Sequence, residues 1–173
     1  MTRKQKKTKE WKRRQKKIKE RQRSREAIIA SQEKLLQRVK NKSANDGNKF
    51  RVEKRSSQQK MSEVIIDFAK PLLDAAQTDE GIQTAIGMAI AMWNVAILPD
   101  KEQKNFIRES FDNTKDSSSN QELPEEYDQV VSYFIARKKV FFSDIKRMIL
   151  DYECVETPQG FHLNVVSTEL DES

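Results

Sequence analysis

The chain has 173 residues, with 33 Lys and Arg against 27 Asp and Glu, a size that suits one compact domain with a sizeable appendage. One cysteine and one histidine exclude an intrachain disulfide and a protein-only zinc site, and we expect neither a metal nor a cofactor. Charge is divided unevenly, because residues 1–60 carry 23 basic and 6 acidic side chains whereas residues 61–173 carry 10 and 21. This asymmetry predicts two physically different parts that join near residue 60.

Residues 1–40 form the predicted basic helical arm. From residue 2 onward the arm has no Gly or Pro and consists largely of good helix formers. At about 100° per residue, a thin apolar seam of the coiled-coil kind follows one line of this helix: Trp11, Ile18, Ile29 and Leu36. Because like charges crowd the first 25 residues, we expect them to fray when alone, whereas residues 26–40 have a stronger apolar face.

Residues 41–60 are rich in Asn, Ser, Lys and Gly, which predicts a flexible linker. The pattern changes at Met61, where Ser62 is the predicted N-cap of an amphipathic helix. Pro71 is expected to kink that helix or to restart it.

A second helix, capped by Thr78 or Asp79, is predicted to run to about Leu98. It contains most of the charge-free stretch 81–99, which includes two glycines, a glutamine and an asparagine. A membrane-spanning helix needs about 20 predominantly apolar residues. We therefore expect a buried helix of a globular domain and no membrane contact.

Two further helices are predicted. Asp100 opens the third, whose buried side holds Phe106, Ile107 and Phe111, and residues 112–123 form a polar loop. The fourth begins at Pro124. Its expected core-facing side chains recur with helical spacing: Tyr127, Val130, Val131, Phe134 and Ile135.

From Lys146 the apolar period switches to two, and residues 157–160 have the composition of a turn, which together predict a β-hairpin. The better register places Cys154 opposite Leu163 on the core face and sends His162 to the other face. The predicted fold class is therefore α+β, a small acidic domain over residues 61–168 with about four helices and this hairpin. Residues 169–173 are expected to form a disordered tail.

No set of residues carries a catalytic signature, and we expect no enzyme activity and no catalytic residue. Cys154 and His162 could form a nucleophile pair, but the register separates them, so a buried thiol and a solvated histidine are favoured. Asp67 and Asp74 lie two turns apart, which suits a solvated helix face better than a carboxylate pair. Asn94 is expected to be a structural amide that has found partners.

The basic arm is the strongest chemical feature, because it attracts polyanions and releases their counterions. It predicts a non-enzymatic accessory protein that binds RNA or DNA with low sequence specificity through the arm, with Trp11 stacking on bases. The acidic domain is expected to engage a protein partner. The candidate nucleic-acid-binding residues are Trp11, Lys12, Arg13, Arg14, Lys16, Lys17, Arg21, Arg23 and Arg25. Four other possibilities stay open: a solubilising tail, an arm folded back on the acidic domain, a protein-interaction module without a nucleic-acid role, and an uncharacterised enzyme.

The strings SEVIIDFAKPLLDAA, AIAMWNVAILP and FFSDIKRMILDYECVETPQGFHLNVVST, between about Ser62 and Thr168, carry a resemblance. They resemble a group of uncharacterised bacterial proteins that have a basic N-terminus and a small α+β domain. The matching points are Pro71, Trp93, Asn94, Pro99, Asp151, Tyr152 and Leu163. The resemblance implies a bacterial domain that begins near residue 61, and it assigns no catalytic residue. With no secretory signal pattern at the N-terminus, we expect a cytoplasmic protein.

Overall fold

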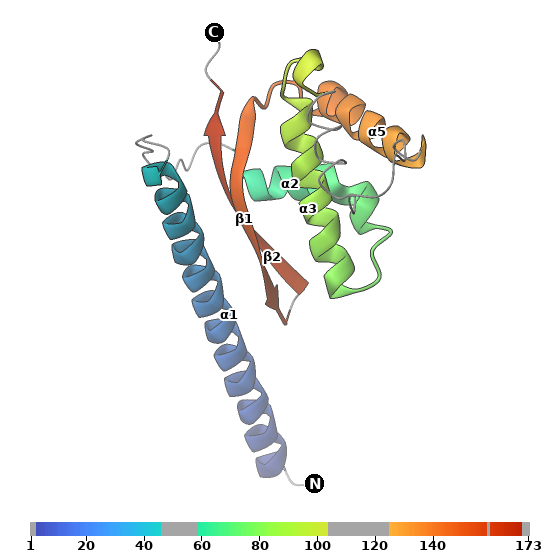
Figure 1. Cartoon of the computed structure of the whole chain (residues 1–173). Helices are drawn as coiled ribbons and strands as arrows, with labels where there is room; N and C mark the ends of the chain where they lie inside the picture. Colours follow the sequence, from blue (N-terminus) through green and yellow to red (C-terminus); the bar gives the residue numbers. More distant parts are fainter. Residues whose placement is uncertain (1–2, 46–58, 104–124, 159, 171–173) are drawn as a thin grey trace, which may run out of the picture. The chain divides into compact units, whose positions relative to one another are not determined.

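The structure, a computed structural model, describes residues 3–45, 59–103, 125–158 and 160–170. Figure 1 shows its main elements in chain order: α1 (Arg3–Asn45), α2 (Met61–Leu73), α3 (Asp79–Ala96), α5 (Glu125–Phe141), β1 (Arg147–Thr157) and β2 (Gly160–Glu169). The two strands pair as a hairpin. The predicted α+β class, with a long N-terminal helix and a C-terminal hairpin, is confirmed.

The chain divides by its contacts into two units. The helix–hairpin unit contains α1 and the outer part of the hairpin, Asp151–Val166. The three-helix unit contains α2, α3 and α5 together with the open end of the hairpin, up to Leu150 and from Ser167. The predicted acidic domain, residues 61–168, includes the whole hairpin. The contacts instead group the outer part of the hairpin with α1.

α1 is a continuous helix from Arg3 to Asn45. It therefore includes the first five residues of the predicted linker, and residues 46–58 of that linker lie outside the described residues. The absence of Gly and Pro before residue 46 explains this length, because each position is occupied by a residue that tolerates the helix interior.

Aromatic side chains form the centre of the three-helix unit. Phe68 of α2 packs edge to face against Trp93 of α3 and against Phe134 of α5, each with ring centroids 5.2 Å apart. All three rings are buried, and α3 contacts both α2 and α5. Edge-to-face pairs at this spacing add about 0.5–1.5 kcal/mol each beyond the burial of their area.

The helix boundaries follow the predicted caps only in part. The N-cap residue of α2 is Lys60, without a side-chain capping bond, so the predicted cap at Ser62 is wrong. The predicted cap at Thr78 is confirmed, because its Oγ1 accepts a hydrogen bond from Gly81 N at 3.0 Å. α3 covers most of the charge-free stretch, and no helix in the described ranges is long and apolar enough to cross a membrane.

Pro71 lies in the last turn of α2, which neither restarts as a second helix nor continues beyond Leu73. A proline has no amide hydrogen, so the carbonyl of Asp67, four residues earlier, loses its usual helical partner. Arg137 of α5 replaces that partner, donating from Nη2 to the Asp67 carbonyl at 3.0 Å and from Nε to the Phe68 carbonyl at 3.3 Å. The proline in α2 thereby creates a polar link to α5.

Lys138 of α5 is a buried lysine with its ammonium group satisfied inside the unit. Its Nζ donates to the Phe142 carbonyl at 2.7 Å and to the Ile145 carbonyl at 3.0 Å, and lies 4.5 Å from the centre of the Trp93 ring. Burial lowers the pKa of Lys138, although the nearby Asp144 carboxylate acts in the opposite direction. The lysine thus provides a hydrogen-bond donor for two carbonyl groups that follow the C-terminal end of α5.

Two side chains of α3 hold the beginning of β1. Asn94 donates from Nδ2 to the Ile149 carbonyl and accepts at Oδ1 from the Ile149 amide, both at 2.8 Å. Trp93 donates from Nε1 to the Arg147 carbonyl at 2.8 Å. The amide of Asn94 thus pairs with the strand as a neighbouring strand would, which confirms the structural role expected of it.

Other predictions have mixed outcomes. Residues 100–103 are helical, as expected for the start of the third helix, but the rest of that helix and the polar loop 112–123 lie outside the described residues. On α5, Val131 and Phe134 are buried as predicted. Val130 is exposed, so its core-facing assignment is wrong, because the buried side of α5 is narrower than the helical spacing of its apolar residues suggested.

Replacing Asn94 with Leu is expected to lower the free energy of unfolding by about 2–4 kcal/mol, because the amide and carbonyl of Ile149 would both lose their partner. Urea unfolding followed by the fluorescence of Trp93 measures the change. Gln83→Leu, an exposed change on the same helix, is the control and is expected to stay within about 0.5 kcal/mol of the unchanged protein. Equal losses in the two variants would contradict the role assigned to Asn94.

Candidate nucleic-acid interface

The C-terminal half of α1 is attached to the outer hairpin by one face. In the described part of the helix–hairpin unit, the hydrogen bonds and ion pairs that join α1 to the hairpin start between Ser31 and Lys42. Asn164 of β2 links to two of these residues, donating from Nδ2 to Ser31 Oγ at 2.9 Å and accepting from Gln32 Nε2 at 3.2 Å. Leu35 and Val39 are buried on the same side of the helix.

Arg38 makes the most extensive of these contacts. Its guanidinium binds both carboxylate oxygens of Asp151, with Nε to Oδ2 at 3.0 Å and Nη2 to Oδ1 at 3.3 Å. It also donates from Nη1 to Glu153 Oε2 at 2.5 Å and from Nη2 to the Tyr152 carbonyl at 3.0 Å. Forked contacts of this kind combine charge with fixed geometry, so Arg38 sets the position of α1 along β1.

The pKa values of this cluster are shifted by its own contacts. Hydrogen bonds to Asp151 and then to Glu153 raise the pKa of Arg38. Burial opposes ionisation of Asp151, but hydrogen bonds from Arg38 and from the Tyr152 amide outweigh it and lower the pKa of this carboxyl group. Lys34 and Lys42 extend the cluster, lying 3.4 Å from Glu153 and 3.8 Å from Asp151.

Between Lys9 and Arg25, α1 is exposed to solvent around most of its circumference, with Glu20 and Ser24 partly covered. All nine candidate binding residues are exposed: Trp11, Lys12, Arg13, Arg14, Lys16, Lys17, Arg21, Arg23 and Arg25. The acids within this half lie on the helix itself, and two of them pair with cations one turn away, Glu10 with Arg14 at 2.7 Å and Glu20 with Lys16 at 3.9 Å. Exposed pairs of this kind contribute little and compete weakly with an external anion.

The apolar seam of the arm lies on the solvent side along most of its length. Trp11 is 60% exposed, and Ile18 and Ile29 are about half exposed. The buried line is a different one, through Ser31, Leu35 and Val39, which recur every four residues. The arm therefore does fold back on the hairpin, as one of the open possibilities held, and the described hydrogen bonds and ion pairs that attach it come from residues 31–42.

The docking residues were not found from the sequence. Arg38 is one of 33 basic residues, and nothing in its local pattern distinguishes it from the others. Asp151 and Glu153 alternate along β1, so they lie on the same face of the strand. Lys34, Arg38 and Lys42 recur every four residues, so they lie on one face of α1. This cationic face complements the acidic face of β1, and the two spacings together were the sequence signal for the contact.

Cys154 is half-buried, and burial raises the pKa of its thiol, with the charge of Glu153 adding to the effect. A thiol that stays protonated at neutral pH is the opposite of an activated nucleophile. Asp67 and Asp74 are both exposed, as a solvated face requires. Among the residues that the structure describes, no group of His, Cys, Asp and Glu is placed to hold a metal ion.

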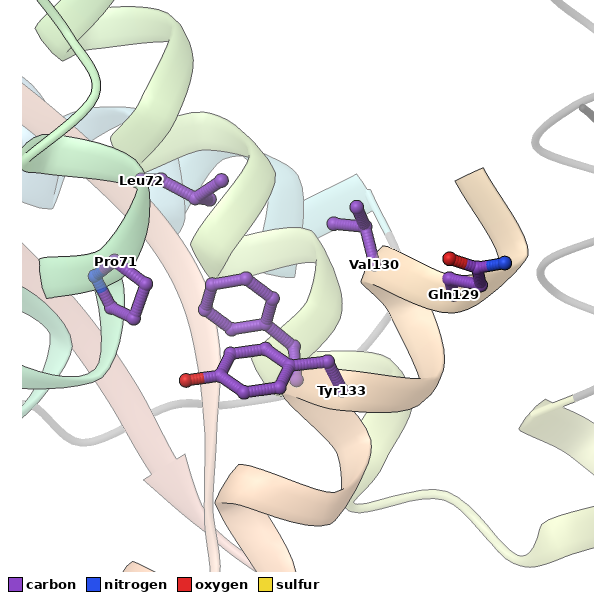
Figure 2. A pocket seen from close by; sticks show the side chains of 6 residues that line it. Pro71, Leu72, Gln129, Val130 and Tyr133 are labelled. Carbon is purple, nitrogen blue, oxygen red and sulfur yellow. The ribbon is translucent and has the colours of Figure 1, made fainter. Parts of the chain in front are cut away.

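A pocket of about 420 Å³ lies between α2 and α5 in the three-helix unit. Figure 2 shows Pro71 and Leu72 on one side of it and Val130 and Tyr133 on the other. Its remaining lining residues are Gln129 and Phe134. The lining has no charged side chain, so the pocket suits an apolar group better than a phosphate.

Comparisons of this chain with protein families, with curated proteins and with solved structures find no match.

Arg38→Lys is expected to weaken the attachment of α1 at pH 7 by about 1–2 kcal/mol, because an ammonium group cannot make the forked contact. Hydrogen exchange of the α1 amides between residues 31 and 42 measures it. Arg21→Lys, at an exposed position, is the control.

Acid provides a second readout of the same contact. Because the pKa of Asp151 is lowered on folding, its contribution is complete well above the ordinary pKa of an aspartate, about 3.9, and is lost as pH falls through the lower folded pKa. The difference between the Arg38→Lys protein and the unchanged protein is therefore expected to shrink in acid. A difference that is independent of pH would show that packing, and not the ion pair, holds the helix.

Proposed function

We propose that this protein binds RNA or DNA through the exposed N-terminal half of α1, with low sequence specificity and without catalysis. One observation carries the proposal: ten Lys and Arg side chains between residues 9 and 25 are all exposed, on a helix that is held to the protein by its other half. The bacterial cytoplasm is the proposed location.

Physical chemistry favours a polyanion as the partner. Each phosphate neutralised by an arm cation releases condensed counterions, so ten clustered cations make binding favourable but strongly dependent on salt. The hairpin carboxylates Asp151 and Glu153 are already paired with residues 34–42 of α1, which leaves the cations of residues 9–25 for an external partner.

Sequence readout requires hydrogen bonds to base edges from side chains in fixed positions. The exposed half of α1 presents mainly long, flexible cations, which contact phosphates more readily than bases. Low sequence specificity follows. Trp11, exposed at one edge of this surface, is available to stack on unpaired bases if the partner is single-stranded.

A salt titration tests the proposal. The variant Arg13→Gln, Lys16→Gln, Lys17→Gln is expected to reduce the slope of log K against log salt by about 2–3, since three phosphate contacts are lost. Fluorescence anisotropy with mixed-sequence RNA and DNA measures the slope in the full chain. The control Lys60→Gln, Lys70→Gln, Lys101→Gln removes the same charge from exposed positions elsewhere. Equal salt slopes for the two variants would show that the arm does not carry the binding.

A protein-interaction module is the second candidate, favoured by the apolar surface of α5. Val140 is 70% exposed and Phe141 is 68% exposed, and Tyr133 is exposed beside the apolar pocket. Large apolar side chains that gather on one helix commonly mark a protein contact.

This second function predicts that a photo-crosslinker at position 141 captures a defined protein in cells, whereas one at position 88, an exposed apolar residue of α3, does not. Tyr133→Ser in the same chain is expected to reduce the crosslink severalfold. Identical products from positions 141 and 88 would argue against a specific surface.

A further inference from the structure

The cations of α1 are spread around the helix and do not form a single stripe. At about 100° per residue, those between residues 9 and 25 cover roughly 240° of the circumference. The remaining sector contains no cation and is occupied in this stretch by four other side chains: Trp11, Gln15, Ile18 and Gln22. The cations and these four side chains are all exposed, whereas Glu20 and Ser24, which lie inside the arc, are partly covered.

The width of the arc decides what kind of polyanion fits. A helix with its side chains is about 10–12 Å across, and a single strand or a flat surface can approach only one side of such a cylinder. Cations on opposite flanks are neutralised together only where phosphates stand on both sides of the helix. A groove of a double helix has this arrangement, because the phosphates of the two strands line its two sides.

The dimensions of the grooves distinguish DNA from RNA. The major groove of B-form DNA is about 12 Å wide and about 8.5 Å deep and admits an α-helix. The major groove of A-form RNA is deep and too narrow for side chains to read. The floor of the DNA groove presents acceptors at every base pair, guanine N7 and O6 or adenine N7 and thymine O4. The cations at the centre of the arc, such as Arg13 and Lys17, therefore meet an acceptor in any sequence.

We propose that residues 9–25 of α1 lie in the major groove of duplex DNA, with the two flanks of the basic arc on the phosphates of the two strands. This inference rests on the proposed nucleic-acid function and specifies its ligand. The cation-free sector, with Trp11 and Ile18, then points out of the groove. Glu10 and Glu20 lie inside the arc, and their helical partners Arg14 and Lys16 offset their charge.

Two matched variants of the full chain test the two-sided contact. One flank is neutralised by Arg14→Gln, Arg21→Gln and Arg25→Gln, and the other by Lys12→Gln, Lys19→Gln and Arg23→Gln. All six positions are exposed. Glutamine is a good helix former, and circular dichroism checks that each variant keeps its helix. The probes are a mixed-sequence 25-base-pair DNA duplex, the same sequence as single-stranded DNA, and the same sequence as an RNA duplex.

Groove binding predicts that the DNA duplex is the tightest ligand and that each flank variant lowers its salt slope by a similar amount, about 2–3. Gln15→Ala, an exposed change in the cation-free sector, is expected to leave duplex binding unchanged. Dimethyl sulfate footprinting is expected to protect guanine N7, in the major groove, and to leave adenine N3, in the minor groove, reactive.

Loss of binding in one flank variant only would overturn the groove assignment, and so would protection of adenine N3 alone. Preferential binding of single strands that is lost in Trp11→Ala, or preferential binding of the RNA duplex, would leave the proposed function intact and remove the DNA groove. Binding to none of the three probes would remove both.

Discussion

The guanidinium of Arg38 decides which half of α1 is covered and which half faces solvent. Its forked contact with Asp151, together with its bonds to Glu153 and the Tyr152 carbonyl, fixes the helix against one face of β1. Asp151 and Glu153 are only two acids, and Lys34 and Lys42 share them. Their charge is therefore used within about two turns of α1, and among the described side chains the cations of residues 9–25 have no ion pair with the hairpin.

This arrangement has a consequence for binding energy. A disordered basic tail loses conformational freedom when it meets a polyanion, and that loss reduces its affinity. The basic residues of α1 already lie on a helix that is held at its base, so less ordering remains to be done on binding. The opposing effect is repulsion among neighbouring cations, which an arriving phosphate relieves. The pre-formed helix and the mutual repulsion of its cations both favour binding of a polyanion.

Local patterns predicted the parts of the fold that depend on neighbouring residues. The long helix, the Thr78 cap and the C-terminal hairpin follow from composition, spacing and turn chemistry over a few residues. Local patterns could not predict the contacts that join segments distant in the sequence. Alternation along β1 showed that Asp151 and Glu153 share a face but not that α1 covers it. Likewise, the exposed arm was identified from its charge, whereas the anchor at Arg38 depends on residues more than 110 positions away.

The pairing of Pro71 with Arg137 bears on how this chain could have arisen by stepwise substitution. The arginine supplies a donor to a backbone oxygen that the proline leaves without its helical partner. A proline that appeared first would have left this oxygen without a protein donor, whereas an arginine that appeared first would have cost little at the surface of α5. The ancestral order in which arginine preceded proline is therefore the easier path. With both present, loss of the arginine alone leaves the Asp67 carbonyl without its protein donor, so the two positions are coupled.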